Sequence, residues 1–392
     1  MKNLLHQRFL FQAKRMKKNS IYIHFPYCVK KCNYCDFISF PCGGVAPDLL
    51  EYYLREVELY HQKFGRKKIS SIYFGGGTPS LMPAEMVEKI LEKICTLYDV
   101  SDDCEITLEV NPKTVSDKKL FAFYQAGINR LSIGIQSLDD EELKFLGRVH
   151  SANDAMATLG FAKKYFSNIS CDFIYAIPNQ SLEKWQKNLD EISGLEVQHL
   201  SLYELIIEPK TPIFSWVKSG KIQPLSETVS KKMYEYTNRF LKNKFPQYEI
   251  SNYSKKGYES RHNLNYWNGG DYIGIGVGAA GRVFDGKKHF ISENPRTVLE
   301  WKKKLDAGIL PLKTLSKTKR AEEMLILGLR KNRGINFKEF IENSGVNFFD
   351  IVDEKMFQNM VNQKFLISSE SSVRASVKGR SVLDAVIREI IK

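Results

Sequence analysis

The chain has 392 residues, of which 43% are hydrophobic and 26% charged, enough for one large domain with a small one or for two to three ordinary domains. This composition excludes a disordered chain, a collagen and a minimal disulfide-stapled scaffold. Lys and Arg outnumber Asp and Glu by 58 to 45, and the net charge of +13 favours anionic partners such as nucleic acid, a membrane surface or a polycarboxylate. Solvated lysines spread along the chain explain the same charge equally well.

The first segment, residues 1–19, is basic and carries no acid. Its apolar runs are too short and interrupted for a secretory signal. We expect this segment to be untranslated, with Met16 as the real start, or disordered; a basic organelle-targeting peptide is the alternative. No later run reaches the roughly 18 to 20 apolar residues of a membrane-spanning helix, so we expect any membrane contact to be peripheral.

From residue 20 onward, short apolar or β-branched runs alternate with longer helical stretches, which is typical of repeated βα units around a parallel sheet. The predicted strands are Ile21–Phe25, Ile69–Phe74, Glu105–Val110, Arg130–Ile135, Ile169–Ile174 and Val197–Leu202. Six such units predict an α/β fold, an incomplete parallel (β/α)6 barrel. In parallel α/β folds the ligand chemistry gathers at the carboxyl ends of the strands.

The alternation of strand-like and helical segments ends at about residue 210. A helical segment follows, and then a stretch rich in Tyr, Asn and Gly from Gln247 to Arg282. We predict a large domain over 20–290 and a small α+β domain over 291–392. In the latter, short helices precede two strands, Phe365–Ser368 and Val373–Ser376, which resembles a winged helix. An embedded winged helix is often packing material, so we do not expect nucleic-acid binding.

Three of the seven cysteines, Cys28, Cys32 and Cys35, form a C-x3-C-x2-C motif directly after the first predicted strand. This spacing indicates a metal site in a reducing compartment, and we expect a cytoplasmic protein. A four-ligand zinc site would need a second cysteine pair, which the chain lacks. Three thiolates suit a [4Fe-4S] cluster with one iron left open. Only Cys42 is near enough to raise the alternative of a fourth ligand.

Polar and glycine motifs follow the other predicted strands. Gly75–Thr78 comes after the second strand, where glycines let a backbone approach a ligand and offer it N–H groups. Glu109, Gln136 and Asp172 stand near the ends of the third, fourth and fifth strands, and Arg148 follows in Gly-Arg-Val-His. A tight turn and strand-end capping are the structural alternatives.

Together, the cysteine motif after Tyr22-Ile-His-Phe-Pro-Tyr and the Gly-Gly-Gly-Thr-Pro turn resemble the radical S-adenosylmethionine (SAM) superfamily. The resemblance implies that the open iron binds SAM and that the sulfonium is cleaved reductively to a 5′-deoxyadenosyl radical. Over residues 20 to 390 the motifs are similar to the coproporphyrinogen dehydrogenase (HemN-like) branch. By that likeness the SAM-binding residues are Tyr22, Tyr34, Gly76, Gly77, Thr78, Glu109, Gln136, Arg148 and Asp172.

The chain departs from the dehydrogenase at Phe37, where that enzyme has a further cysteine, and in its shorter arm before the cysteine loop. It gains His262-Asn-Leu-Asn-Tyr266-Trp267, an H-N-x-x-Y-W motif that resembles HemW-type haem chaperones. Imidazole is a common haem-iron ligand, and Tyr and Trp faces can cover a macrocycle. The resemblance therefore implies a haem site at His262, Tyr266 and Trp267; a structural histidine in an aromatic loop is the alternative.

We expect a monomeric or weakly dimeric protein that binds haem, a [4Fe-4S] cluster and SAM and delivers haem to acceptor proteins, with a reductant for the cluster as a further partner. The enzyme alternative is oxygen-independent oxidation of coproporphyrinogen III, and whether the chain is an enzyme stays open. Radical SAM modification of RNA, a third alternative, agrees with the charge but lacks an appended RNA module.

Overall fold

The structure, a computed structural model, describes residues 19–42 and 44–392. The predictions for the basic amino-terminal segment lie outside the described residues, apart from Asn19, which begins the first strand. No helix in the described part of the chain has the length and apolar character needed to cross a membrane.

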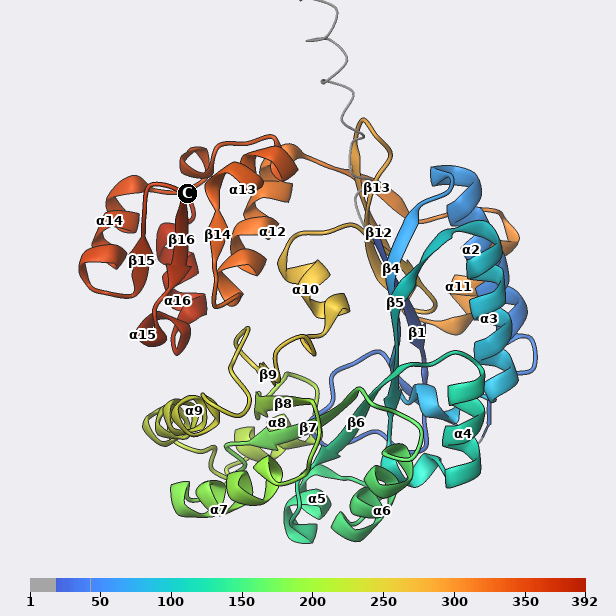
Figure 1. Cartoon of the computed structure of the whole chain (residues 1–392), viewed down its shortest axis with the longest axis horizontal. Helices are drawn as coiled ribbons and strands as arrows, with labels where there is room; N and C mark the ends of the chain where they lie inside the picture. Colours follow the sequence, from blue (N-terminus) through green and yellow to red (C-terminus); the bar gives the residue numbers. More distant parts are fainter. Residues whose placement is uncertain (1–18, 43) are drawn as a thin grey trace, which may run out of the picture.

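The six predicted strands all form, and they are consecutive parallel neighbours in one sheet, in the order β1-β4-β5-β6-β7-β8. Their bounds are β1 Asn19–Phe25, β4 Lys68–Gly76, β5 Asp99–Val110, β6 Arg130–Gln136, β7 Ile169–Tyr175 and β8 His199–Glu204. The sheet curves into an open barrel with its helices on the outside (Figure 1). The predicted fold class is confirmed.

The outer helices each bury one apolar face on the sheet. In α3, Met86, Val87, Ile90 and Ile94 recur at helical spacing and are nearly inaccessible to solvent, and each such side chain stabilises the fold by about 1.5–3 kcal/mol. The barrel helices are α2 Leu49–Phe64, α3 Ala84–Leu97, α4 Asp117–Gln125, α5 Asp140–Leu146, α6 Ala152–Ala162, α7 Leu182–Ser193, α8 Pro212–Lys218 and α9 Glu227–Leu241.

Five more strands extend the sheet at both edges, so the six-strand prediction was incomplete. They are β9 Asn252–Ser254, β10 Tyr272–Ile275, β11 Ala280–Phe284, β12 His289–Glu293 and β13 Leu312–Leu315. β10 lies parallel to β1, whereas β9 and β11 to β13 are antiparallel to their neighbours. The sequence pattern did not predict β10, because Gly274 at its centre has low strand propensity. Glycine is needed there, since a Cβ on Gly274 would collide with the backbone of Ala280.

A buried carboxylate attaches this added edge to the barrel. Glu56 of α2 accepts the backbone N–H of Gly276 at 2.8 Å, the amide of Asn294 at 2.6 Å and the indole N–H of Trp301 at 2.9 Å. Burial outweighs these three bonds and raises the pKa of Glu56 to about 7. Trp301 belongs to α11 Val298–Asp306, which therefore packs in the first hydrophobic core.

A second hydrophobic core begins at Ala321 and runs to Ile390. It is enclosed by α12 Lys317–Arg330, α13 Phe337–Ser344, α14 Glu354–Asn362, α15 Val377–Arg380, α16 Leu383–Ile390 and the small sheet of β14 Ile335–Asn336, β15 Leu366–Ser368 and β16 Ser372–Ala375. The two carboxyl-terminal strands predicted from the sequence correspond to β15 and β16. Because β13 still belongs to the large sheet, we propose a domain boundary near residue 316 in place of 290.

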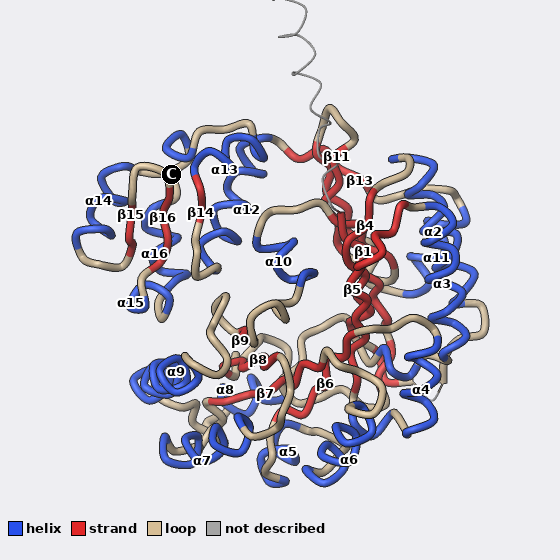
Figure 2. The backbone as a smooth tube through the Cα atoms, in the orientation of Figure 1, coloured by secondary structure: helices blue, strands red, loops and turns tan. Residues whose placement is uncertain are grey.

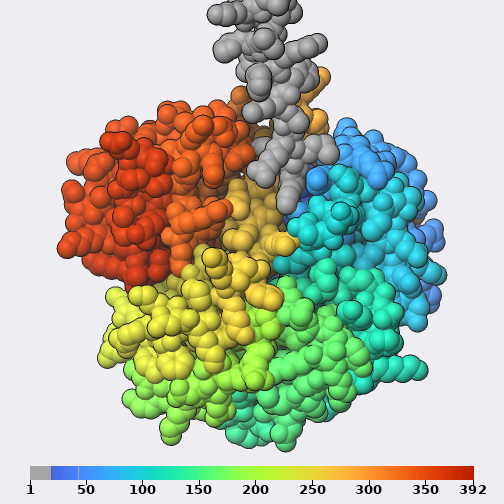
Figure 3. All heavy atoms as spheres, in the orientation of Figure 1, coloured from blue at the N-terminus to red at the C-terminus, as the bar shows by residue number. Residues whose placement is uncertain are grey.

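One short helix, α10 Arg261–Trp267, lies on the inner side of the barrel, and the tube view places it between the strands and the small domain (Figure 2). It packs against β1 and β4 on one side and against α12 on the other. The space-filling view shows the gold residues around α10 in the seam between the blue-to-green barrel and the orange small domain (Figure 3). This helix carries the H-N-x-x-Y-W motif.

Candidate functional site

The cysteine loop is closed by a two-stranded parallel sheet immediately after β1. β2 Tyr27–Cys28 pairs with β3 Phe40–Pro41, so the two ends of the cysteine loop lie side by side. Between them the backbone N–H of Cys35 donates to the carbonyl of Cys32 at 3.3 Å. Cys28, Cys32 and Cys35 are free thiols that line a single cavity of about 470 Å³, which we call the cluster cavity.

The donor set of this cavity fits a [4Fe-4S] cluster. Three thiols on one loop can each bind a different iron and leave the fourth iron open. Arg148 donates from Nη1 to the sulfur of Cys32 at 3.3 Å, a contact of the kind that tunes cluster potentials. Among the residues that the structure describes, no three His, Cys, Asp or Glu side chains are placed to bind one single metal ion together. A cluster does not require this, because each of its thiolates binds a separate iron.

The other four cysteines have different surroundings. The thiol of Cys42 donates to the carbonyl of Gly44 at 2.6 Å and accepts its N–H, whereas Cys104 and Cys171 are buried and Cys95 is exposed on α3. Cys42 therefore already has local partners, and it does not line the cluster cavity.

Eight of the nine predicted SAM residues line the cluster cavity together with the cysteines. They are Tyr34, Gly76, Gly77, Thr78, Glu109, Gln136, Arg148 and Asp172. Glu109 and Gln136 lie at the ends of β5 and β6, and Gly76, Gly77 and Thr78 lie at the end of β4 and just after it. Tyr34 belongs to the cysteine loop, Asp172 lies within β7, and Arg148 follows α5. The ninth, Tyr22, lies in an adjoining cavity, where its hydroxyl bonds to Nδ1 of His24 at 3.0 Å.

The glycine turn differs from its prediction in one respect. The N–H of Gly77 donates to the carbonyl of Phe25 at 2.7 Å, and the N–H of Thr78 donates to that of Tyr27 at 2.8 Å. These two amides fasten the turn to the start of the cysteine loop and are not free for a ligand. Glycine is needed because a Cβ on Gly77 would lie 2.6 Å from the carbonyl oxygen of Tyr27, and because Gly76 has φ +110°.

Two partly buried carboxyl groups, Glu109 and Asp172, line the cluster cavity. Burial, reinforced by the nearby Asp172, raises the pKa of Glu109 to about 7, although Tyr73 donates its hydroxyl to Glu109 at 2.9 Å. Burial also raises the pKa of Asp172, which accepts hydrogen bonds from Ser132 at 2.8 Å and Ser170 at 3.1 Å. A cationic ligand beside these groups would favour their ionised forms.

Arg148 connects several lining residues of the cluster cavity. Its Nη2 donates to the carbonyl of Gly134 at 2.9 Å, and the guanidinium also bonds to Tyr34. Gln136 ends β6 with φ +70°, a left-handed conformation that is uncommon for a residue other than glycine. Together these contacts hold an Arg, an amide and a phenol around the same cavity as the two carboxyl groups.

A second cavity of about 660 Å³ adjoins the first, and we call it the aromatic cavity. Its volume lies in the range of cofactor sites. Tyr266 and Trp267 of α10 line it together with Tyr22 and Tyr272. The two cavities share Asp36, Phe37, Gly76 and Glu109 as lining residues, so a ligand in one would lie next to a ligand in the other.

His262, by contrast, points into the protein. Its Nε2 bonds to the hydroxyl of Tyr266 at 2.7 Å and its Nδ1 to the hydroxyl of Ser71 at 3.0 Å, and the residue is 1% exposed. Burial, with the charge of Arg130 as a smaller cause, lowers its pKa to about 3. A role as axial iron ligand would require one of these two bonds to break, and that role stays a prediction.

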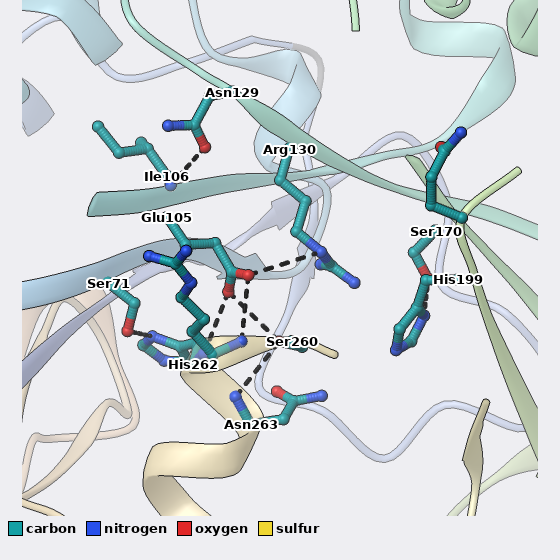
Figure 4. A network of polar contacts seen from close by, with 12 residues as sticks. Ser71, Glu105, Ile106, Asn129, Arg130, Ser170, His199, Ser260, His262 and Asn263 are labelled. Atoms are coloured by element: carbon teal, nitrogen blue, oxygen red, sulfur yellow. Dashed lines mark hydrogen bonds and ion pairs between the residues drawn. The ribbon is translucent and has the colours of Figure 1, made fainter. Parts of the chain in front are cut away.

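The amino-terminal end of α10 is held by a carboxylate from the sheet. Glu105 of β5 accepts the backbone N–H groups of Arg261 and His262, each at 3.1 Å, and lies 4.0 Å from the guanidinium of Arg130 (Figure 4). A negative charge at a helix amino terminus is stabilising. This network fixes α10 on the sheet, so that Tyr266 and Trp267 reach the aromatic cavity.

Sequence reasoning missed several lining residues. Asn263, from the same motif, lines the cluster cavity, and Arg282 of β11 and Arg320 of α12 line the aromatic cavity. Asn263 stood inside the recognised motif and could have been found by its position. The two arginines could not be found in this way, because only the fold brings β11 and α12 to the cavity that α10 lines.

Comparisons with known proteins agree with this arrangement. The radical SAM superfamily model matches residues 22–192, and the HemN C-terminal domain model matches residues 315–382. A mitochondrial radical S-adenosyl methionine domain-containing protein 1 from Danio rerio is 35% identical, over 95% of this chain and 86% of its own length. Proteins named heme chaperone HemW from Buchnera aphidicola and Bacillus subtilis are 34% and 31% identical and are covered over 98% and 96% of their lengths.

The chain belongs to the HemW-like branch of the HemN family of radical SAM proteins. Its fold is that of coproporphyrinogen III oxidase, HemN, from Escherichia coli, with a TM-score of 0.77 over 98% of this chain and 92% of that one. The sequence identity to that enzyme is 20%, so this likeness concerns the fold alone. Membership in the HemW-like branch was predicted from the motifs and is confirmed.

Proposed function

We propose that the protein binds haem, one [4Fe-4S] cluster and SAM, and that it delivers haem to acceptor proteins. The observation that carries this proposal is the aromatic cavity beside the cluster cavity, lined by Tyr266 and Trp267 of the H-N-x-x-Y-W motif. Relatives covered almost completely by this chain are named heme chaperone HemW, which supports the same function.

Cys28, Cys32 and Cys35 would hold the cluster, and the polar residues of the cluster cavity would hold SAM. When bound, the cluster supplies a site for one-electron reduction beside SAM. Ionised Glu109 and Asp172 would pair with the cationic and hydroxyl groups of SAM, and Arg148 with its carboxylate. The supply of electrons requires a reductant as partner.

In the aromatic cavity we assign separate tasks to the three predicted haem residues. Tyr266 and Trp267 would contact the macrocycle, since aromatic faces pack well on flat rings. His262 would position Tyr266 through its 2.7 Å bond to the hydroxyl. The basic surface and the seven free thiols agree with an anionic ligand and with a reducing compartment, and we propose the cytoplasm.

Haem titration of the purified protein, followed by mixing with apomyoglobin, tests the proposal. We expect a Soret band to appear on titration and to move to the myoglobin position after mixing. Haem that does not stay with the protein on a desalting column would contradict haem binding, and haem that never moves to apomyoglobin would contradict the delivery role.

A second candidate is oxygen-independent oxidation of coproporphyrinogen III. The observation that favours it is the fold likeness to HemN, with a cluster cavity whose donor set suits SAM. An anaerobic assay with coproporphyrinogen III, SAM and a reductant tests this candidate, because oxidation of the propionate side chains releases CO2. We expect no CO2 above the level given by the Cys28→Ala variant.

A further inference from the structure

The small domain contributes one wall of the aromatic cavity through α12. Arg320, Glu323, Ile326 and Leu327 of this helix line the same cavity as Tyr266 and Trp267. Arg282 of β11 lines it as well. A ligand in this cavity would therefore touch both domains, and the charged groups of α12 would help decide which ligands are accepted.

Arg282 forms an ion pair with Glu323 inside this cavity. Its Nε donates to both carboxylate oxygens of Glu323, at 3.0 and 3.1 Å, and its Nη2 donates to Oε1 at 2.8 Å. Both side chains are mostly shielded from solvent, with exposed fractions of 17% and 27%. This two-pronged geometry is the one with which arginine recognises a carboxylate of any source.

Arg320 beside it is less well satisfied. Its side chain is 3% exposed, its Nη1 lies 3.8 Å from Glu323 and its Nη2 lies 3.8 Å from Asp271, beyond hydrogen-bond distance. Nη2 also donates to the carbonyl of Gly269, and Nε is buried without a hydrogen-bond partner. A buried guanidinium with an unsatisfied N–H lowers the cost of bringing a further carboxylate into the cavity.

We propose that Glu323 is an exchangeable carboxylate that occupies Arg282 until a carboxylate-bearing macrocycle enters the aromatic cavity, and that a propionate of the ligand then takes its place. This inference rests on the proposed haem binding and adds the group that controls it. The exchange replaces one carboxylate on Arg282 by another, so no proton moves and the charge on the arginine stays paired. Glu323 turns to solvent, which its exposed fraction of 27% permits.

An exchange of this kind suits a protein that must give its ligand away. A propionate that leaves Arg282 does not expose a bare guanidinium, because Glu323 returns to it. A competing internal carboxylate therefore weakens haem binding and lowers the barrier to release at the same time. Removal of its charge should have the opposite effect on both.

The test compares two ligands, haem and haem dimethyl ester, on the wild type and on Glu323→Gln. For haem we expect roughly tenfold tighter binding and slower release in E323Q, because the carboxylate that competes with the propionate for Arg282 has lost its charge. For the ester, which lacks both carboxylates, we expect the two proteins to bind alike, and we expect the wild type to bind the ester about tenfold more weakly than haem.

Glu322→Gln is the matched control, because Glu322 is the neighbouring residue on α12, its carboxylate pairs with Lys319, and it does not line the cavity. E322Q should bind both ligands as the wild type does. Equal binding of haem and its ester by the wild type, or equal gains in E323Q and E322Q, would overturn the inference while leaving haem binding in place. Failure of the wild type to bind either ligand would overturn the proposed function and this inference with it.

Discussion

The cluster cavity and the aromatic cavity share a wall, but they are built from different parts of the chain. The first is formed by the cysteine loop and by the carboxyl ends of successive parallel strands, so each functional residue follows a strand at a regular place. The second combines α10, the added strands β10 and β11, and α12 of the small domain. The first cavity therefore belongs to the barrel, whereas the second depends on how the two domains meet.

A clear difference in chemistry accompanies this difference in construction. The cluster cavity has thiols, buried carboxyl groups and an arginine bonded to a thiol, which suits a fixed cofactor. The aromatic cavity has tyrosines, a tryptophan and an exchangeable ion pair, which suits a ligand that enters and leaves. Variants that affect one cavity and spare the other test this separation.

The largest effect is expected from the cysteine loop. Replacing Cys28, Cys32 or Cys35 by Ala should abolish the broad visible absorption of an anaerobically reconstituted cluster, because two thiolates rarely hold a cube. Haem binding in the aromatic cavity should persist. Iron and sulfide analysis measures the cluster, and Cys42→Ala, which removes a thiol bonded to Gly44, serves as control. A variant that lacks all three cysteines and still has the full iron and sulfide content would contradict the cluster assignment. Loss of the cluster in C42A would make Cys42 a fourth ligand.

The buried carboxyl groups should give the next largest effect. Asp172→Ala and Glu109→Ala should weaken SAM binding roughly ten- to a hundredfold, the equivalent of one charge-assisted hydrogen bond. Cluster content should not change, since neither group is a thiolate. Isothermal titration with SAM measures the affinity. Unchanged SAM binding in both variants would mean that these residues serve the strand ends and not a ligand.

The pKa of Glu109, about 7, predicts a pH dependence of SAM binding. If SAM requires the ionised form, about one tenth of the protein is competent at pH 6 and about nine tenths at pH 8, so affinity should rise nearly tenfold over this interval. Glu109→Gln should flatten the profile. Because burial raises the pKa above its usual 4.5, Glu109 also favours the folded state below pH 4.5 and loses this contribution as pH rises through about 7.

Glu56→Gln separates these two consequences. The pKa of Glu56 is also raised to about 7 by burial, but Glu56 bonds to Gly276, Asn294 and Trp301 and lines neither cavity. E56Q should alter the pH dependence of stability and keep the wild-type pH dependence of SAM binding. A SAM profile that stays steep in E109Q would show that another group titrates.

The smallest effect on a ligand is expected at His262. His262→Ala should lower the free energy of unfolding by about 2 kcal/mol, because Ser71 and Tyr266 would each lose a buried hydrogen-bond partner. The haem affinity should change only a few-fold, and the Soret band should stay in place. Melting curves and haem spectra on the same sample measure both quantities. A shifted Soret band with unchanged stability would instead make His262 the axial ligand.

How much the sequence predicts follows the same division. The cysteine spacing and the polar strand ends are local signals, and eight of nine predicted SAM residues line one cavity for this reason. The partners of the Gly77 and Thr78 amides could not be read from the chain, since they depend on where β2 begins relative to β4. Arg282 and Arg320 were missed because nothing in the sequence indicates that β11 and α12 meet at α10.

The inward orientation of His262 has a similar cause. Asn263, Tyr266 and Trp267 of the motif line the two cavities, and residues four apart on a helix share a face. Here that pairing lets His262 reach the hydroxyl of Tyr266, while Ser71 of β4 receives its other nitrogen. The position of β4 beneath the helix, which the sequence does not give, decides which member of the motif is buried.

The most direct measurement is made on one anaerobically reconstituted preparation, divided between a haem titration and an assay with coproporphyrinogen III, SAM and reductant. We expect saturable haem binding with the cluster absorption unchanged, since the ligand and the cluster use different side chains, and no release of CO2 from the porphyrinogen. Turnover of the porphyrinogen by a preparation that does not retain haem would contradict this expectation.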